Sequence, residues 1–160
     1  MSADIPLITT MFQTNASLFD KATEGIREDQ WLATPGNASN HLTWIAGHVV
    51  IHRAKIPRLL GQEWSAPWED LFSRGSKLVA AGEYPQPPEI RRAWNEVSQT
   101  LSVGLSAASP EILARPVPKG TPTLDGTVGG TIGLLCLHET YHIGQLGYLR
   151  KLLGYGQTIG

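Results

Sequence analysis

The sequence predicts an all-α fold, a four-helix bundle with a long crossover between its second and third helices. Apolar residues recur at spacings of three and four in four separate stretches, which is the pattern of amphipathic helices. Aromatic and β-branched residues nowhere alternate cleanly over six or more positions, so no strand is indicated. The chain has 160 residues, the length of one domain. We therefore expect a single bundle domain over residues 1–160.

The first two helices are predicted over residues 5–27 and 41–60. Asp4 can cap the first of them, and a stretch rich in Pro, Gly and Asn separates it from the second. Gly61 follows the last apolar residue of the second helix, as is typical of a helix end.

Residues 62–88 are too many for a bare loop in a compact domain, so we expect a packed crossover with a short helix around the sequence WEDLF. The third helix begins at PPEI, with prolines in its first turn, and its apolar stripe runs from Ile90 to Leu105. A proline-rich link then leads to a fourth helix, predicted over residues 126–153.

Charge and cysteine content exclude several classes of protein. Thirteen Lys and Arg against fourteen Asp and Glu give a formal charge of −1, so neither nucleic acid nor an anionic membrane is an expected partner. No apolar run approaches the roughly 18 residues of a membrane span, and the N-terminus lacks a signal-peptide pattern. The single cysteine, Cys136, cannot form an intrachain disulfide and is expected to be a packed core residue. We expect a cytoplasmic protein.

The histidines carry the main chemical signal, because all five fall within the second and fourth predicted helices. They are His41, His48, His52, His138 and His142. His138 and His142 are four residues apart, so they lie one turn apart on the same apolar helix face. Buried neutral imidazoles need partners for their ring nitrogens, and a divalent metal ion satisfies one nitrogen of each. The pair therefore predicts a metal site inside the bundle.

The ligand from the second helix is ambiguous from spacing alone. His41, His48 and His52 are seven and four residues apart, so they share one flank of the helix. On a helical wheel His52 lies nearer the centre of the apolar arc than His48, which mildly favours His52. His41 lies in the first turn and is expected to be a surface or capping-turn residue.

Three segments of the chain carry a family resemblance: NHLTWIAGHVVIHRA, the stretch from FSRGS to YPQPPEIRRAWNEV, and LHETYHIGQLGYLRKLLG. Together they resemble the DinB and YfiT-like metalloenzymes. The resemblance covers nearly the whole chain and implies an up-down-down-up bundle with a three-histidine metal site. It implies His48, His138 and His142 as the metal ligands, and thus His48 rather than His52. The family includes transferases and isomerases that use low-molecular-weight thiols, as well as members without an assigned reaction.

Three histidines leave an open coordination position on a metal ion, as in catalytic sites. A bound divalent ion lowers the pKa of its water toward about 7 and can hold a thiol as thiolate. With zinc or nickel as the expected ion, we predict a thiol-dependent transferase or a hydrolase acting on a small-molecule substrate. The alternative is a non-catalytic metal-binding or stress-related bundle protein. Candidate catalytic residues are Glu139, His52 and Gln145.

A zinc peptidase is the rival interpretation, because HETYH matches the HExxH pattern with Glu139 as general base. A metzincin needs a histidine where this chain has Tyr148, and no third ligand follows His142. Glu139 also points about 100° away from His138 on the helix. Glu139 or Gln145 is therefore better suited to orienting a ligand imidazole through its second nitrogen.

The fourth helix is rich in glycine, which permits close approach of another helix, either within the bundle or across a homodimer. We expect a homodimer.

Overall fold

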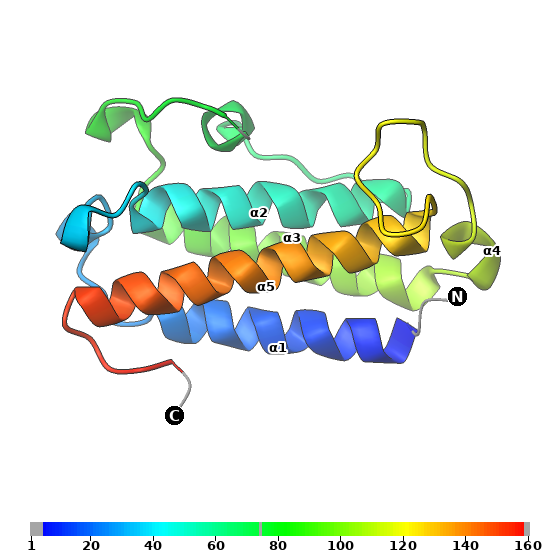
Figure 1. Ribbon diagram of the computed structural model, residues 1–160, viewed down its shortest axis with the longest axis horizontal. Helices are drawn as coiled ribbons and strands as arrows, with labels where there is room; N and C mark the ends of the chain where they lie inside the picture. Colours follow the sequence, from blue (N-terminus) through cyan, green and yellow to red (C-terminus); the bar gives the residue numbers. More distant parts are fainter. Residues whose placement is uncertain (1–4, 74, 159–160) are drawn as a thin grey trace.

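The computed structural model describes residues 5–73 and 75–158, and it is all-helical, as predicted. Four long helices lie side by side (Figure 1). They are α1 (Ile5–Thr23), α2 (Leu42–Leu59), α3 (Pro87–Ala107) and α5 (Val128–Leu152). A one-turn helix, α4 (Pro110–Leu113), precedes α5. Within the described ranges the β-type pairing is one isolated bridge, between Pro116 and Thr127.

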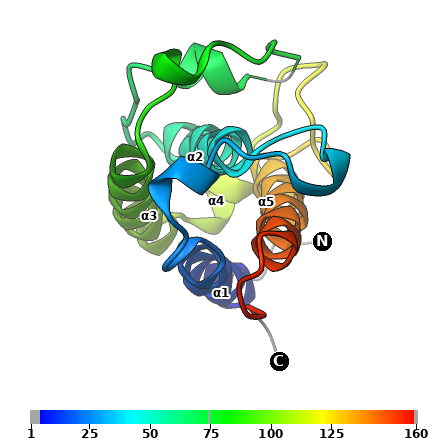
Figure 2. The ribbon, with the colours of Figure 1, turned by 90° about the vertical axis from the view of Figure 1, so that its left-hand side faces the viewer.

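The four long helices surround a common core, as the end-on view in Figure 2 shows. Helix α2 packs on α3 and α5, and α1 packs on the same two helices. In Figure 1 the chain runs along α1 and α5 in one direction and along α2 and α3 in the other. Between α2 and α3 the crossover passes over the outside of α2, and its Glu69–Phe72 segment forms a one-turn 3-10 helix that packs on α2. The short helix expected around WEDLF is therefore present.

Local backbone chemistry explains where the first helices begin and end. Helix α1 stops at Thr23 instead of the predicted residue 27, because Gly25 takes a φ of 69° that a helix cannot continue through. The predicted cap of that helix, Asp4, lies outside the described residues. At the start of α2, His41 is the N-cap, and its Nδ1 accepts a hydrogen bond from the Trp44 backbone N–H at 3.1 Å. His41 is thus a capping residue, but it is buried and not on the surface.

Helix α4 was not predicted from the proline-rich link. Ser109 caps it by accepting a hydrogen bond from the Ile112 N–H at 3.3 Å, and Pro110 occupies its first position, where proline loses no hydrogen bond. Thr127 caps α5 in the same way, with its side chain accepting from the Gly130 N–H. Helix α5 begins two residues after its predicted start at 126 and ends one residue before its predicted end at 153.

The interior of the bundle consists of two apolar clusters. One is built around Phe19 and Trp94, and the other around Phe12 and Ile132. Arg53 of α2 touches both clusters: its guanidinium carbon lies 3.8 Å from the centre of the Trp94 ring and 5.6 Å from that of Phe12. A charged side chain in this position needs buried partners.

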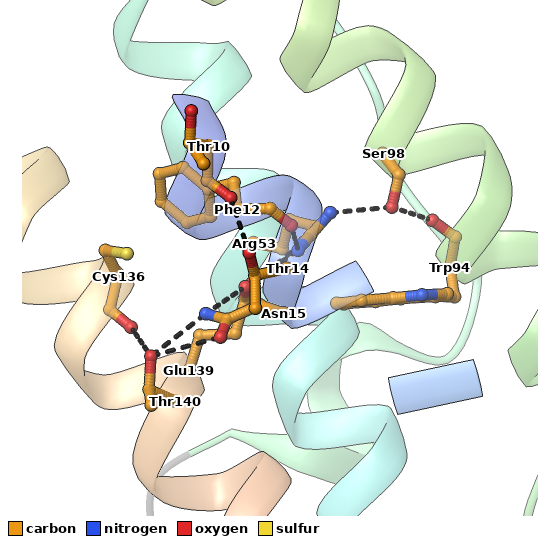
Figure 3. Close-up of polar contacts among 10 residues, drawn as sticks. All are labelled: Thr10, Phe12, Thr14, Asn15, Arg53, Trp94, Ser98, Cys136, Glu139 and Thr140. Carbon is orange, nitrogen blue, oxygen red and sulfur yellow. Dashed lines mark hydrogen bonds and ion pairs between the residues drawn. The ribbon is translucent and has the colours of Figure 1, made fainter. Parts of the chain in front are cut away.

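Those partners come from the other three long helices (Figure 3). Arg53 donates from Nε and Nη2 to the two carboxylate oxygens of Glu139 on α5, at 2.8 and 2.7 Å. Its Nη1 donates to the Ser98 hydroxyl of α3 at 2.7 Å, and Nη2 also donates to the Phe12 carbonyl of α1 at 3.1 Å. Asn15 of α1 donates to Glu139 at 3.0 Å. Arg53 and Glu139 are each 2% exposed, so this buried network connects all four long helices.

Replacing Arg53 by methionine should lower the free energy of unfolding by about 3–5 kcal/mol, because the Glu139 carboxylate stays buried without its counter-charge. The double variant Arg53→Met/Glu139→Leu should recover much of this loss, since it removes both charges. Urea denaturation followed by circular dichroism measures both effects. Arg27→Met, which breaks an exposed ion pair with Asp29, is the control and should change stability little. A similar small change for Arg53→Met would contradict the structural role of the pair.

Candidate metal centre

Four histidines face one another across the contact between α2 and α5. His48 and His52 lie one turn apart on α2, and His138 and His142 lie one turn apart on α5. The His48 ring centre is 5.2 Å from that of His138 and 4.8 Å from that of His142. The structure thus brings together residues that are 90 positions apart in the sequence.

Three ring nitrogens converge at the centre of this cluster. The Nε2 atom of His138 lies 3.3 Å from His48 Nε2 and 3.2 Å from His142 Nε2. The ligand atoms of these three residues all lie within 4.8 Å of one another, so the group can hold a metal ion. It consists of the three residues that the family resemblance implied.

The opposite ring nitrogens determine which tautomers are present. His48 Nδ1 lies 2.7 Å from the Phe72 carbonyl oxygen, and His142 Nδ1 lies 2.7 Å from the Gln145 side-chain oxygen. Since a carbonyl oxygen only accepts, each Nδ1 carries the hydrogen, and each Nε2 directs a lone pair into the cluster. Gln145 thus occupies the orienting position predicted for it.

His138 completes an arrangement that suits a cation. Its Nδ1 is buried and has no hydrogen-bond partner among the described residues, so, unlike in His48 and His142, no acceptor fixes its tautomer. One hydrogen on His138 Nε2 can serve only one of the two lone pairs that face it from His48 and His142. A divalent ion accepts a lone pair from all three nitrogens at once, so the donor set fits a metal.

Burial keeps these imidazoles neutral. Desolvation lowers the pKa of His48 and of His138 to about 4, and it also lowers the pKa of His142. The positive charges that neighbouring histidines would carry act in the same direction on His48 and His138. The neutral form is the one that binds a metal ion, so near pH 7 the cluster is in the ligating state.

His52 lies beside the cluster but outside the three-residue group. Its Nδ1 is 2.9 Å from the His48 backbone carbonyl, one turn earlier in the same helix, and its ring stacks on that of His138 with centres 4.4 Å apart. Burial lowers its pKa to about 3. The helical-wheel argument for His52 did not allow for this bond to its own helix, which turns the ring along α2.

Glu139 points away from the histidines, into the Arg53 network (Figure 3). Arg53 and Asn15 occupy its carboxylate oxygens, so it contacts none of the three imidazoles and is not placed to serve as a peptidase base. Neither the pairing of Arg53 with Glu139 nor the burial of the two side chains was predicted from the sequence. The one signal for a buried charge was the position of Arg53, between His52 and Ala54 in an apolar helix. Cys136 is buried, and burial raises the pKa of its thiol to about 11, which fits a packed residue.

A groove of about 570 Å³ opens beside the cluster and is lined by residues of α2, α5 and the loop that precedes α5. His52 and His138 line part of it, together with leucines of both helices. The lining residues are His52, Lys55, Arg58, Leu59, Thr121, Pro122, Thr131, Leu134, Leu135 and His138. Its volume is in the range of small-molecule binding sites.

The partner of His48 depends on a close packing contact. The Phe72 ring is fully buried against α2 at Gly47, where a Cβ atom would lie 2.5 Å from it. Glycine therefore lets the crossover approach α2 closely enough for the Phe72 carbonyl to reach His48. Trp44 stacks on the other side of the cluster, with its ring centre 4.7 Å from that of His48. Sequence reasoning missed the Phe72 contact, because a backbone carbonyl leaves no signal in residue type.

Fold and site together define a helical-bundle protein with a three-histidine group able to hold a metal ion. The chain belongs to the DinB superfamily, whose family model matches residues 11–146. This match confirms the resemblance identified from the sequence. No curated protein matches the chain. No helix within the described part of the chain is long and apolar enough to cross a membrane.

Gly47→Ala should destabilise the protein by about 1–3 kcal/mol, because the added methyl forces the buried Phe72 ring to move. It should also weaken zinc binding about tenfold, since the Phe72 carbonyl then holds His48 less well. Urea denaturation and zinc titration measure the two effects. Gly144→Ala is the matched control: its Cβ meets no atom within 4 Å, so it should leave zinc binding unchanged and raise stability by up to about 1 kcal/mol. Equal behaviour of the two variants would contradict the packing argument.

Proposed function

We propose that this protein is a metal-dependent enzyme that binds a divalent ion, zinc or nickel, through His48, His138 and His142. It acts on a small-molecule substrate as a thiol-dependent transferase or as a hydrolase. The observation that carries the proposal is the convergence of three Nε2 atoms, two of them fixed as lone-pair donors by acceptors on the opposite nitrogen. We also propose an up-down-down-up order for the four long helices. The directions in which the chain runs along them in Figure 1 support this order.

The chain's own residues position, orient and enclose the reacting groups. When bound, a divalent ion held by three imidazoles keeps an open position and lowers the pKa of a water or thiol there. The Phe72 carbonyl and Gln145 hold the ligand rings in place. His52 lines the groove, and because its Nδ1 donates to its own helix, its Nε2 can accept a hydrogen bond from a substrate there. Among the three catalytic candidates His52 is therefore favoured.

The groove favours an enzyme over a non-catalytic metal-binding or stress-related bundle. A purely structural metal site is closed by its ligands, whereas here an open, largely apolar space reaches His138. Cytoplasmic location and a homodimeric state stay predictions.

Ligand assignment can be tested by two substitutions one helical turn apart. His48→Ala should abolish stoichiometric zinc or nickel, because it removes one of the three convergent nitrogens. His52→Ala should retain the metal, since its ring stacks on the cluster without joining it. Elemental analysis of protein purified without a histidine tag measures the metal content. Loss of metal in His52→Ala but not in His48→Ala would reverse the assignment.

The open coordination position can be tested on cobalt-substituted protein. A low-molecular-weight thiol should change the visible absorption of the cobalt-substituted protein in a saturable way, because thiolate is a strong ligand for such ions. An unchanged spectrum with thiols and with small anions would favour the non-catalytic alternative. His52→Ala is informative here as well, since it should keep the cobalt while slowing any turnover in which the substrate donates a hydrogen bond to His52.

A further inference from the structure

We infer that the groove beside the histidines recognises a small molecule with an aliphatic segment and one carboxylate, and that Lys55 binds the carboxylate. This inference rests on the proposed function for the reacting end of the molecule, which would lie at His138 and His52. It adds the class of substrate and a residue that selects it.

The apolar part of the recognition comes from both helices and the loop. Leu59 of α2, Leu134 and Leu135 of α5 and Pro122 of the loop all line the groove. Such a surface favours an aliphatic segment, because burial of each methylene contributes to binding. With a volume of about 570 Å³, the groove is large enough for a chain of several carbons.

The charged side chains that line the groove are cationic. None of the described residues that line the groove is Asp or Glu, whereas Lys55 and Arg58 both line it. Arg58 already has partners, since it forms an ion pair with Glu69 and donates two hydrogen bonds to the Trp64 carbonyl. Lys55 takes part in none of the ion pairs found in residues 5–73 and 75–158. Lys55 is therefore the cation available to a ligand.

The surroundings of Lys55 would gain from a bound anion. Partial burial, and after it the charge of Arg58, lowers the pKa of the Lys55 ammonium, and the Glu69 carboxylate offsets this lowering only in part. A carboxylate in the groove would offset both effects. One available ammonium matches the single charge of a carboxylate better than the nearly double charge of a phosphate monoester.

The positions along α2 set the order of groups in the ligand. Lys55 follows His52 by three residues, which is about 4.5 Å along the helix axis, and on the same side of the helix. The helices run in opposite directions, so Leu134 and Leu135 lie beyond His138 in the direction of Lys55 and Leu59. A ligand with its reacting group at His138 thus places its carboxylate within one or two helical turns of that group, with its aliphatic segment against the leucines.

Calorimetric titration of acetate, butanoate and hexanoate into chelated and zinc-loaded protein tests this inference. Affinity should rise with chain length in both forms, by up to about fourfold for each methylene. Hexanol and hexyl phosphate should bind more weakly than hexanoate. Lys55→Met should lower the affinity for hexanoate at least tenfold and leave that for hexanol unchanged, and Lys55→Arg should restore it in part. Lys77→Met, an exposed lysine outside the groove, is the matched control.

Several outcomes would overturn the inference: no binding of any probe, equal binding of hexanol and hexanoate, or tighter binding of hexyl phosphate. Hexanoate that binds only to the zinc-loaded form, with no effect of Lys55→Met, would place the carboxylate on the metal alone and would also overturn it. Metal analysis of the same samples separates the two proposals. Protein that takes up no zinc but binds hexanoate through Lys55 would contradict the proposed metal site and support the carboxylate groove.

Discussion

The buried ion pair between Arg53 and Glu139 is the interaction on which the rest of the structure depends. It is bidentate, fully enclosed, and shared with groups from all four long helices. His52 directly precedes Arg53, and His138 directly precedes Glu139. The pair therefore fixes the register of α2 against α5 and, with it, the positions of the histidines. A slip of one turn, about 5.4 Å, between these helices would separate the Nε2 atoms of His48 and His138, which lie 3.3 Å apart.

The same pair explains how one short segment of α5 serves two purposes. Consecutive helical residues point about 100° apart, so Glu139 reaches the buried Arg53 while His138 lines the groove. A buried ion pair is weak evidence for added stability, because desolvation offsets much of the attraction. Its contribution here is to specificity: misaligned helices would leave a charge buried without its partner.

Helices α2 and α5 carry the histidines, and neighbouring groups hold two of the imidazole rings in place. The crossover supplies the Phe72 carbonyl, and α5 supplies Gln145 three residues after His142. Thr121 and Pro122 of the loop before α5 line the groove together with residues of α2 and α5. The histidine group therefore lies beside a space of the size that small molecules occupy.

Local patterns in the sequence by themselves determined the helical fold, the approximate helix bounds, and the HxxxH pair on one face of the last helix. These features depend on residues within a few positions of one another, and periodicity records such relations directly. The family resemblance implied His48 rather than His52, and only the tertiary structure places the His48 Nε2 beside that of His138. Only the tertiary structure pairs Glu139 with Arg53, brings the Phe72 carbonyl to His48 and places Lys55 on the groove. Each of these depends on contacts between segments far apart in the chain, on a backbone carbonyl, or on the rotation of a ring toward its own helix. Residue type and spacing carry no record of such contacts, so they appear only when the helices are packed.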